Sequence, residues 1–149
     1  MQTFNAITHR QLAFLLVEDD EVDVMNVKRA LKKNNLDIPV NRAMNGLEAL
    51  EMLHDYQRHS PSNLKRLIVL LDLNMPKMGG LEFLKVLRSD PHLYKLPVIV
   101  LTTSDQAQDL EAAYELNVAG YVIKPVEFPR FVEIINVIAH YWSICLVPE

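Results

Sequence analysis

The sequence predicts an α/β fold with a doubly wound, five-stranded parallel sheet that is covered by helices on both faces. Two kinds of segment alternate along the 149 residues. Short, almost wholly apolar runs are typical of strands buried on both faces, and the segments between them have apolar residues at helical spacing. Parallel strands need crossover connections, which helices supply on both sides of the sheet. The expected order is a strand and then a helix, repeated five times, or (βα)5.

Five segments are predicted to form the strands. The most apolar ones are residues 12–17, 67–71 and 98–101, and none of them contains a charged side chain. Two weaker candidates, residues 40–43 and 120–123, complete the alternation. The carboxyl ends of all five strands should meet at one edge of the sheet, where sites lie in folds of this class.

Five helices are predicted from apolar residues that recur every three or four positions. The first covers about 21–34, the fourth 105–116 with Ser104 as its N-cap, and the fifth about 127–142. Leucine triplets mark the second and third helices, at Leu47, Leu50 and Leu53 and at Leu81, Leu84 and Leu87. The polar stretch 59–66 is predicted to be a surface loop.

Length and composition indicate one globular domain. The chain is 50% hydrophobic and 23% charged, which is ordinary for a folded protein of this size. We therefore expect residues 1–149 to form a single domain, with a core over about 12–142 and a short apolar C-terminal tail. The net charge of −4 and the lack of a basic stripe give no reason to expect nucleic-acid binding.

Several features favour a cytoplasmic location. The N-terminus is polar and lacks an apolar signal core, and the longest apolar runs are far shorter than a membrane span. We therefore expect no association with a membrane. The lone Cys145 cannot form a disulfide within the chain, which fits a reducing compartment.

Polar side chains follow four of the predicted strands at their carboxyl ends. These residues are Glu18, Asp19, Asp72, Thr102, Thr103 and Lys124, with Pro125 directly after the lysine. Because the sheet should gather them in one cleft, carboxylates, a hydroxyl and an ammonium would lie together. This combination indicates a site that handles phosphate.

The chemistry of such a cleft is coherent. Clustered carboxylates repel one another, so a divalent cation should bind among them, and oxygen ligands suit Mg²⁺. Bound metal keeps Asp72 ionised, and an ionised carboxylate can attack a phosphoryl donor to give an aspartyl-phosphate. Lys124 can then hold one phosphoryl oxygen as a point charge, and Thr102 can donate a hydrogen bond to another.

Each of these residues alone has a simpler explanation. The acids between positions 18 and 23 can complement the dipole at a helix start. Asp72 can be a turn residue, Lys124 a solvated lysine and Thr102 a hydroxyl at a strand end. Only their joint placement at successive strand ends favours a functional site.

Five segments, in this order, resemble a response regulator receiver domain over roughly residues 12–142. They are LLVED at 15–19, LLDLNMP at 70–76, GG at 79–80, VLT at 100–102 and GYVIKP at 120–125. The resemblance implies the flavodoxin-like, CheY-like fold. It also implies a single-domain response regulator of a two-component phosphorelay, which accepts a phosphoryl group from a histidine kinase and signals by protein–protein contact.

The resemblance also implies a role for each matching residue. Asp72 would be the phosphoacceptor, and Mg²⁺ would be held by Asp19, by Asp72, by the backbone carbonyl of Asn74 and, through water, by Glu18. The acidic pair can also be counted as Asp19 and Asp20, although alignment from the strand favours Glu18 and Asp19.

The remaining matches concern the phosphoryl group and the response to it. Lys124 would bind phosphate, Thr102 would be the switch hydroxyl and Tyr121 the aromatic switch. Pro125 would shape the turn after the lysine, in the family often through a cis bond.

The last predicted helix is apolar on two faces. One face should pack on the sheet, and the second consists of Ile134, Val137, Tyr141 and Ile144. These four side chains either cover the fourth helix or the C-terminal tail, or form a symmetric homodimer interface. The loop near 60–66 and the apolar ending resemble the small regulators of cyanobacterial phytochromes, which implies a phytochrome-type sensor histidine kinase as donor.

Three other functions compete with this hypothesis. A phosphohydrolase with an aspartyl nucleophile usually has a second aspartate at the position of Asn74, and a flavodoxin-type cofactor module needs a glycine- or hydroxyl-rich loop after the first strand. A docking module that is never phosphorylated would not need Asp19, Asp72, Thr102 and Lys124 together. We expect no enzyme beyond self-catalysed phosphorylation and dephosphorylation, and no attached output domain.

Overall fold

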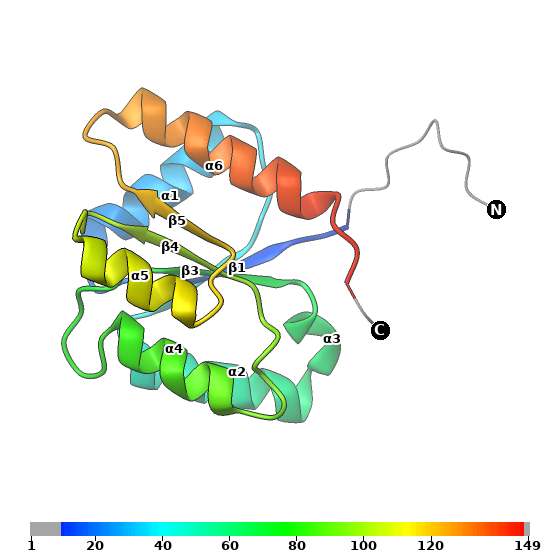
Figure 1. Ribbon diagram of the computed structural model, residues 1–149. Helices are drawn as coiled ribbons and strands as arrows, with labels where there is room; N and C mark the ends of the chain where they lie inside the picture. Colours follow the sequence, from blue (N-terminus) through cyan, green and yellow to red (C-terminus); the bar gives the residue numbers. More distant parts are fainter. Residues whose placement is uncertain (1–9, 148–149) are drawn as a thin grey trace.

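The computed structural model describes residues 10–147, and it confirms the predicted (βα)5 fold (Figure 1). The strands are β1 (Ala13–Val17), β2 (Val40–Ala43), β3 (Leu67–Leu71), β4 (Val98–Thr102) and β5 (Gly120–Ile123). The helices are α1 (Glu21–Lys33), α2 (Gly46–His59), α3 (Pro61–Leu64), α4 (Gly80–Ser89), α5 (Ala107–Glu115) and α6 (Phe128–Ser143). In the described part of the chain, no helix is both long and apolar enough to cross a membrane.

The five strands form one parallel sheet in the order β2-β1-β3-β4-β5. The strand order reverses beside β1, which is where α/β sheets of this kind open a crevice. Val17 is paired with Ala43 on one side and with Leu71 on the other, so β1, β2 and β3 end at the same level. The residues that follow these strands are therefore brought to one edge.

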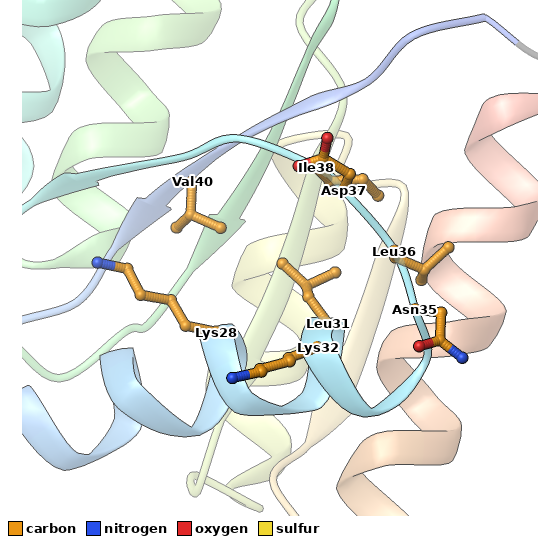
Figure 2. A pocket seen from close by; sticks show the side chains of 8 residues that line it. All are labelled: Lys28, Leu31, Lys32, Asn35, Leu36, Asp37, Ile38 and Val40. Atoms are coloured by element: carbon orange, nitrogen blue, oxygen red, sulfur yellow. The ribbon is translucent and has the colours of Figure 1, made fainter.

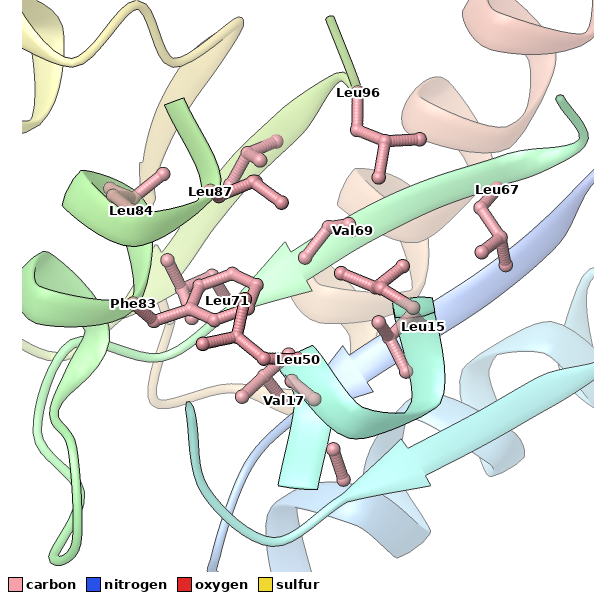
Figure 3. Close-up of a cluster of buried hydrophobic side chains, with 14 of the residues drawn as sticks. Leu15, Val17, Leu50, Leu67, Val69, Leu71, Phe83, Leu84, Leu87 and Leu96 are labelled. Atoms are coloured by element: carbon pink, nitrogen blue, oxygen red, sulfur yellow. The ribbon is translucent and has the colours of Figure 1, made fainter. Parts of the chain in front are cut away.

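Helices cover both faces of the sheet. Helices α1 and α6 lie on one face, and α2, α4 and α5 lie on the other (Figure 1). Every residue of β1, β3 and β4 is buried, and alternate side chains point to opposite faces. On the α2–α4 side, Leu15, Val17 and Leu71 meet Leu50 and Phe83 (Figure 3).

The structure corrects three local expectations. A short helix, α3, lies within the stretch 59–66. Pro61 is in its first turn, where the backbone N–H that proline lacks would have no partner within the helix. The N-cap of α5 is Gln106, and Ser104 instead donates its hydroxyl to Asp109 at 2.6 Å. The described residues include no cis peptide bond, so the bond before Pro125 is trans and not cis.

Candidate functional site

Three carboxylates meet at the carboxyl edge of the sheet. Oxygen atoms of Glu18, Asp19 and Asp72 lie within 4.8 Å of one another. Backbone hydrogen bonds fix their positions, since the amide of Glu18 donates to Ala43 and that of Asp72 donates to Val17, both at 3.0 Å. Glu18 and Asp72 are buried and Asp19 is half-buried. This set of oxygen ligands fits a hard divalent cation such as Mg²⁺.

The next acid along the chain, Asp20, has a different role. It is the N-cap of α1, and its side chain accepts hydrogen bonds from the amides of Val22 at 2.8 Å and Asp23 at 3.4 Å. These bonds satisfy two of the free amides at the helix start. The geometry therefore favours Glu18 and Asp19, and not Asp19 and Asp20, as the acidic pair at the site.

Lys124 lies within the same group of side chains. Its Nζ donates to Glu18 Oε1 at 2.5 Å and to Asp23 Oδ2 at 2.9 Å. Its backbone amide donates to the carbonyl of Thr102 at 2.8 Å, which fixes the start of the side chain. The ammonium is thus bonded to a member of the carboxylate cluster.

Burial and charge act against each other in this ion pair. Burial raises the pKa of Glu18 to about 7, because the cost of placing a charge away from water outweighs the bond from Lys124, and the nearby Asp72 adds to the increase. Burial alone would lower the pKa of Lys124, but Glu18 and Asp23 raise it above its usual value. The lysine is therefore charged at neutral pH.

The hydroxyl at the end of β4 is fully buried. Thr102 Oγ1 accepts a hydrogen bond from the amide of Ser104 at 3.3 Å. The hydroxyl of Tyr121 donates to the carbonyl of Ser104 at 2.9 Å. Both predicted switch residues therefore contact the backbone of one residue in the β4–α5 loop. Thr103, the other threonine of this segment, is exposed and does not join the cluster.

The loop after Asp72 is held by close backbone contacts. The amide of Gly80 donates to the carbonyl of Leu73 at 3.1 Å, and a Cβ on Gly80 would lie 2.6 Å from the carbonyl oxygen of Asp72. The carbonyl of Met78, whose φ is 70°, accepts from the amide of Gly46 at 3.2 Å. The loop that contains Asn74 is therefore fixed at both the α4 and the α2 side.

Sequence reasoning missed Arg42, which holds the acidic loop in place. Its Nε donates to the carbonyl of Glu18 at 2.8 Å and its Nη2 to the carbonyl of Asp19 at 3.0 Å, and Nη1 pairs with Glu21 at 2.6 Å. Only the register of β2 beside β1 makes this contact possible. A single arginine in a short strand gives no signal of it. The bond between Asp23 and Lys124, 101 positions apart, was equally invisible.

A large groove elsewhere on the molecule is separate from this cluster. It lies between the end of α1 and the segment that leads into β2, and Lys28, Leu31, Lys32 and Ile38 line part of it (Figure 2). These residues approach the start of β2, whereas the carboxylates follow the ends of β1 and β3. The groove therefore does not contribute to the candidate site.

Known proteins are similar to this chain in sequence and in fold. The profile of the response regulator receiver domain matches residues 14–136. Response regulator Rcp1 of Synechocystis sp. (strain ATCC 27184 / PCC 6803 / Kazusa) is 36% identical over 128 residues, which is 86% of each chain.

Two solved structures of relatives show the same fold. The phosphorylated cyanobacterial phytochrome response regulator RcpA superposes with a TM-score of 0.80 at 32% identity, over 94% of this chain and all of that one. The Mn²⁺-bound form of Rcp1 gives a TM-score of 0.75 at 32% identity, over 93% of this chain and 99% of that one. With its parallel sheet, its acidic cluster and the family profile over most of its length, this chain belongs to the response regulator receiver domain family.

Proposed function

We propose that Asp72 accepts a phosphoryl group from a phosphohistidine of a sensor histidine kinase in a two-component phosphorelay. The observation that supports this most is the meeting of three carboxylates within 4.8 Å, with the ammonium of Lys124 bonded to one of them. Like charges so close need a cation, and an anionic phosphoryl group brought there needs further positive charge. Family membership assigns the protein to two-component signalling.

The transfer exchanges one bond for another at phosphorus. A carboxylate oxygen of Asp72 attacks the phosphorus in line, the P–N bond to the donor imidazole breaks, and its electron pair stays on the imidazole nitrogen. Lys124 then binds one phosphoryl oxygen, and Thr102 donates its hydroxyl to another.

Asp19, Asp72, the backbone carbonyl of Asn74 and, through water, Glu18 would hold Mg²⁺. When bound there, the cation would neutralise charge on the phosphoryl oxygens. The acidic cluster fits this ion, and the Mn²⁺-bound form of Rcp1 is a relative in which a divalent metal is present. Attack by water on the aspartyl-phosphate would later reset the site without any other substrate.

The output of phosphorylation would be a changed protein surface. Movement of Thr102 toward a phosphoryl oxygen would break its bond with the amide of Ser104, whose carbonyl holds Tyr121. Tyr121 belongs to β5, which lies between α5 and α6 along the chain. A local charge would thus shift the population of conformations at the α5–β5–α6 face.

This face supports a homodimer. Val137 and Tyr141 on α6 and Ile144 at its C-cap are exposed, while Ile134 is half-buried. Ile123 of β5 adds to the same exposed apolar surface. Exposed apolar side chains that lie together can mark an interaction surface, and a second copy of the chain would bury them.

The donor kinase is proposed from the relatives. RcpA is a cyanobacterial phytochrome response regulator, and we therefore propose a phytochrome-type histidine kinase as the partner of this chain. Such a kinase would deliver the phosphoryl group in the cytoplasm. A phosphohydrolase is less favoured, since Asn74 stands where that class has its acid.

Acetyl phosphate, a small phosphoryl donor, tests the chemistry without the kinase. Wild type and Asp72→Asn are incubated with it in Mg²⁺ or in EDTA, and the intact mass is measured. A gain of one phosphoryl group only in wild type and only with Mg²⁺ is expected. Folded wild-type protein that gains nothing would favour a docking module.

A further inference from the structure

The bond between Lys124 and Asp23 has no role in the phosphoryl transfer described above. Asp23 is the third residue of α1, in the first turn, where the helix dipole favours a carboxylate. Its Oδ2 is 2.9 Å from Lys124 Nζ. In the described residues, Lys124 forms ion pairs with Glu18 and Asp23, and none with Asp72. The ammonium therefore bridges Glu18 of the carboxylate cluster and the first turn of α1.

The two partners of Lys124 differ in their surroundings. The side chain of Glu18 is 3% exposed and belongs to the carboxylate cluster, while that of Asp23 is 35% exposed and lies outside it. A cation among the carboxylates would compete with Lys124 for Glu18, because both are attracted by the same oxygens. With the cation bound, Asp23 would still form its ion pair with Lys124.

The lysine has freedom to change partners. Its backbone is fixed by the bond from its amide to Thr102, but the four-carbon side chain can pivot about that point. A small pocket beside it is lined by the polar side chains of Glu18, Asp23 and Asn26 and by apolar side chains of the core, so space remains next to the lysine. An oxygen of a phosphoryl group on Asp72 would compete with Asp23 for the same N–H donors.

We infer that Asp23 is a positioning residue that holds Lys124 away from Asp72 in the resting protein and competes with the phosphoryl group for it. This inference rests on the proposed phosphorylation of Asp72. Helix α1 would thereby influence the equilibrium between the resting state and the state in which Lys124 binds the phosphoryl group. Loss of the Asp23 carboxylate should release Lys124 and favour the phosphoryl-bound state.

Beryllofluoride, which binds an aspartate carboxylate as a phosphoryl mimic, tests the inference at equilibrium in saturating Mg²⁺. Asp23→Asn should bind it about two- to fivefold more tightly than wild type, the range expected for a partly exposed ion pair. Asp23→Glu should restore affinity toward the wild-type value. Glu82→Gln removes an exposed acid from the first turn of α4 and leaves the bonds of Lys124 and Arg42 in place, so it should change the affinity less.

A double-mutant cycle separates a role through Lys124 from a general effect of charge. In a Lys124→Met background, Asp23→Asn should no longer tighten binding, because there is no ammonium for Asp23 and beryllofluoride to compete for. Equal tightening with and without Lys124, or no tightening in Asp23→Asn, would overturn the inference. Wild type that fails to bind beryllofluoride would instead contradict the proposed phosphorylation of Asp72.

Discussion

Gly80 shows how a single residue shapes the site. It begins α4 directly behind Asp72, and a Cβ at this position would lie 2.6 Å from the carbonyl oxygen of Asp72 and 2.7 Å from Leu73 Cα. Both atoms belong to the backbone and cannot rotate away. The absence of a side chain therefore allows α4 to start against the end of β3, which fixes the loop that follows Asp72.

Gly80→Ala should destabilise the fold by about 1–3 kcal/mol, the usual cost of overpacking, as measured by urea unfolding. Gly120→Ala is the matched control, because its Cβ would meet nothing closer than 3.9 Å. That variant should be neutral or more stable, since alanine has less freedom in the unfolded chain. Equal costs at both positions would contradict the role given to Gly80.

Arg42 tests whether the shape of the acidic loop matters apart from its charge. Lysine keeps the positive charge but lacks the planar fork that reaches the carbonyls of Glu18 and Asp19. We expect Arg42→Lys to weaken Mg²⁺ binding about tenfold, as for other residues that orient metal ligands, measured by calorimetry. Unchanged Mg²⁺ affinity would show that the loop holds its shape without the fork.

The sequence predicts those site residues that directly follow a strand, because the end of the strand fixes where they lie. Asp72 and Lys124 follow apolar runs directly, so the parallel sheet alone predicts that they lie at the same edge. Arg42 and Asp23 become part of the site only through side-chain contacts across elements. Contacts of that kind depend on how neighbouring strands are aligned and on side-chain rotamers, which cannot be read from one sequence.

At the scale of elements, α2 and the end of α4 are joined by one polar pair. His54 Nε2 on α2 lies 2.8 Å from Asp90 Oδ2, and the amide of His92 donates to the other oxygen at 2.8 Å. Burial acts to raise the pKa of Asp90, but the bond with His54 and the backbone amides lower it overall. The pair thus favours the ionised carboxylate in the folded state.

This pKa shift predicts how stability depends on pH. A lowered pKa in the folded state gives stability that is present above the ordinary value of 3.8 and is lost as the pH falls through the folded value. Asp90→Asn should therefore be less stable than wild type at pH 7, and the difference should shrink below about pH 3.8. Urea unfolding at several pH values measures both.

Asp55→Asn is the control for that experiment. Asp55 is 68% exposed and lies 3.7 Å from His59, and an exposed pair of this kind contributes little at any pH. If the two variants show the same dependence on pH, the bond between α2 and α4 has no special part in acid unfolding.

Element boundaries were less predictable than element order. The strands and the five main helices follow from apolar periodicity, but α3 was hidden in a polar stretch whose proline and serine also suit a loop. The N-cap at Ser104 was wrong because that hydroxyl bonds to Asp109 in the first turn of α5 instead. Local polar residues serve several kinds of turn equally well, so tertiary contacts decide among them.

In the whole molecule, one face of α6 is buried and a second face is exposed. Helix α6 lies beside α1 on one face of the sheet (Figure 1). Its residues Phe131, Ile135 and Ala139 belong to the buried core on that side, while Val137 and Tyr141 are exposed. The sequence predicted both faces from their spacing alone. The proposed dimer would cover the exposed face.

Val137→Glu should abolish the proposed dimer, because a charge would be buried at its centre. Sedimentation at micromolar concentration should show a dimer for wild type, before or after treatment with acetyl phosphate, and a monomer for the variant. Val22→Glu is a matched control, since Val22 is 64% and Val137 is 66% exposed. A monomeric wild type in both states would exclude the dimer.

Asp72, which lies among three carboxylates within 4.8 Å, is proposed to receive the phosphoryl group. Borohydride reduces an aspartyl-phosphate to homoserine, so peptide mass spectrometry after treatment with acetyl phosphate and Mg²⁺ can locate it. We expect homoserine at position 72, with Glu18 and Asp19 unchanged. A modified residue at 18 or 19 and an intact Asp72 would contradict it.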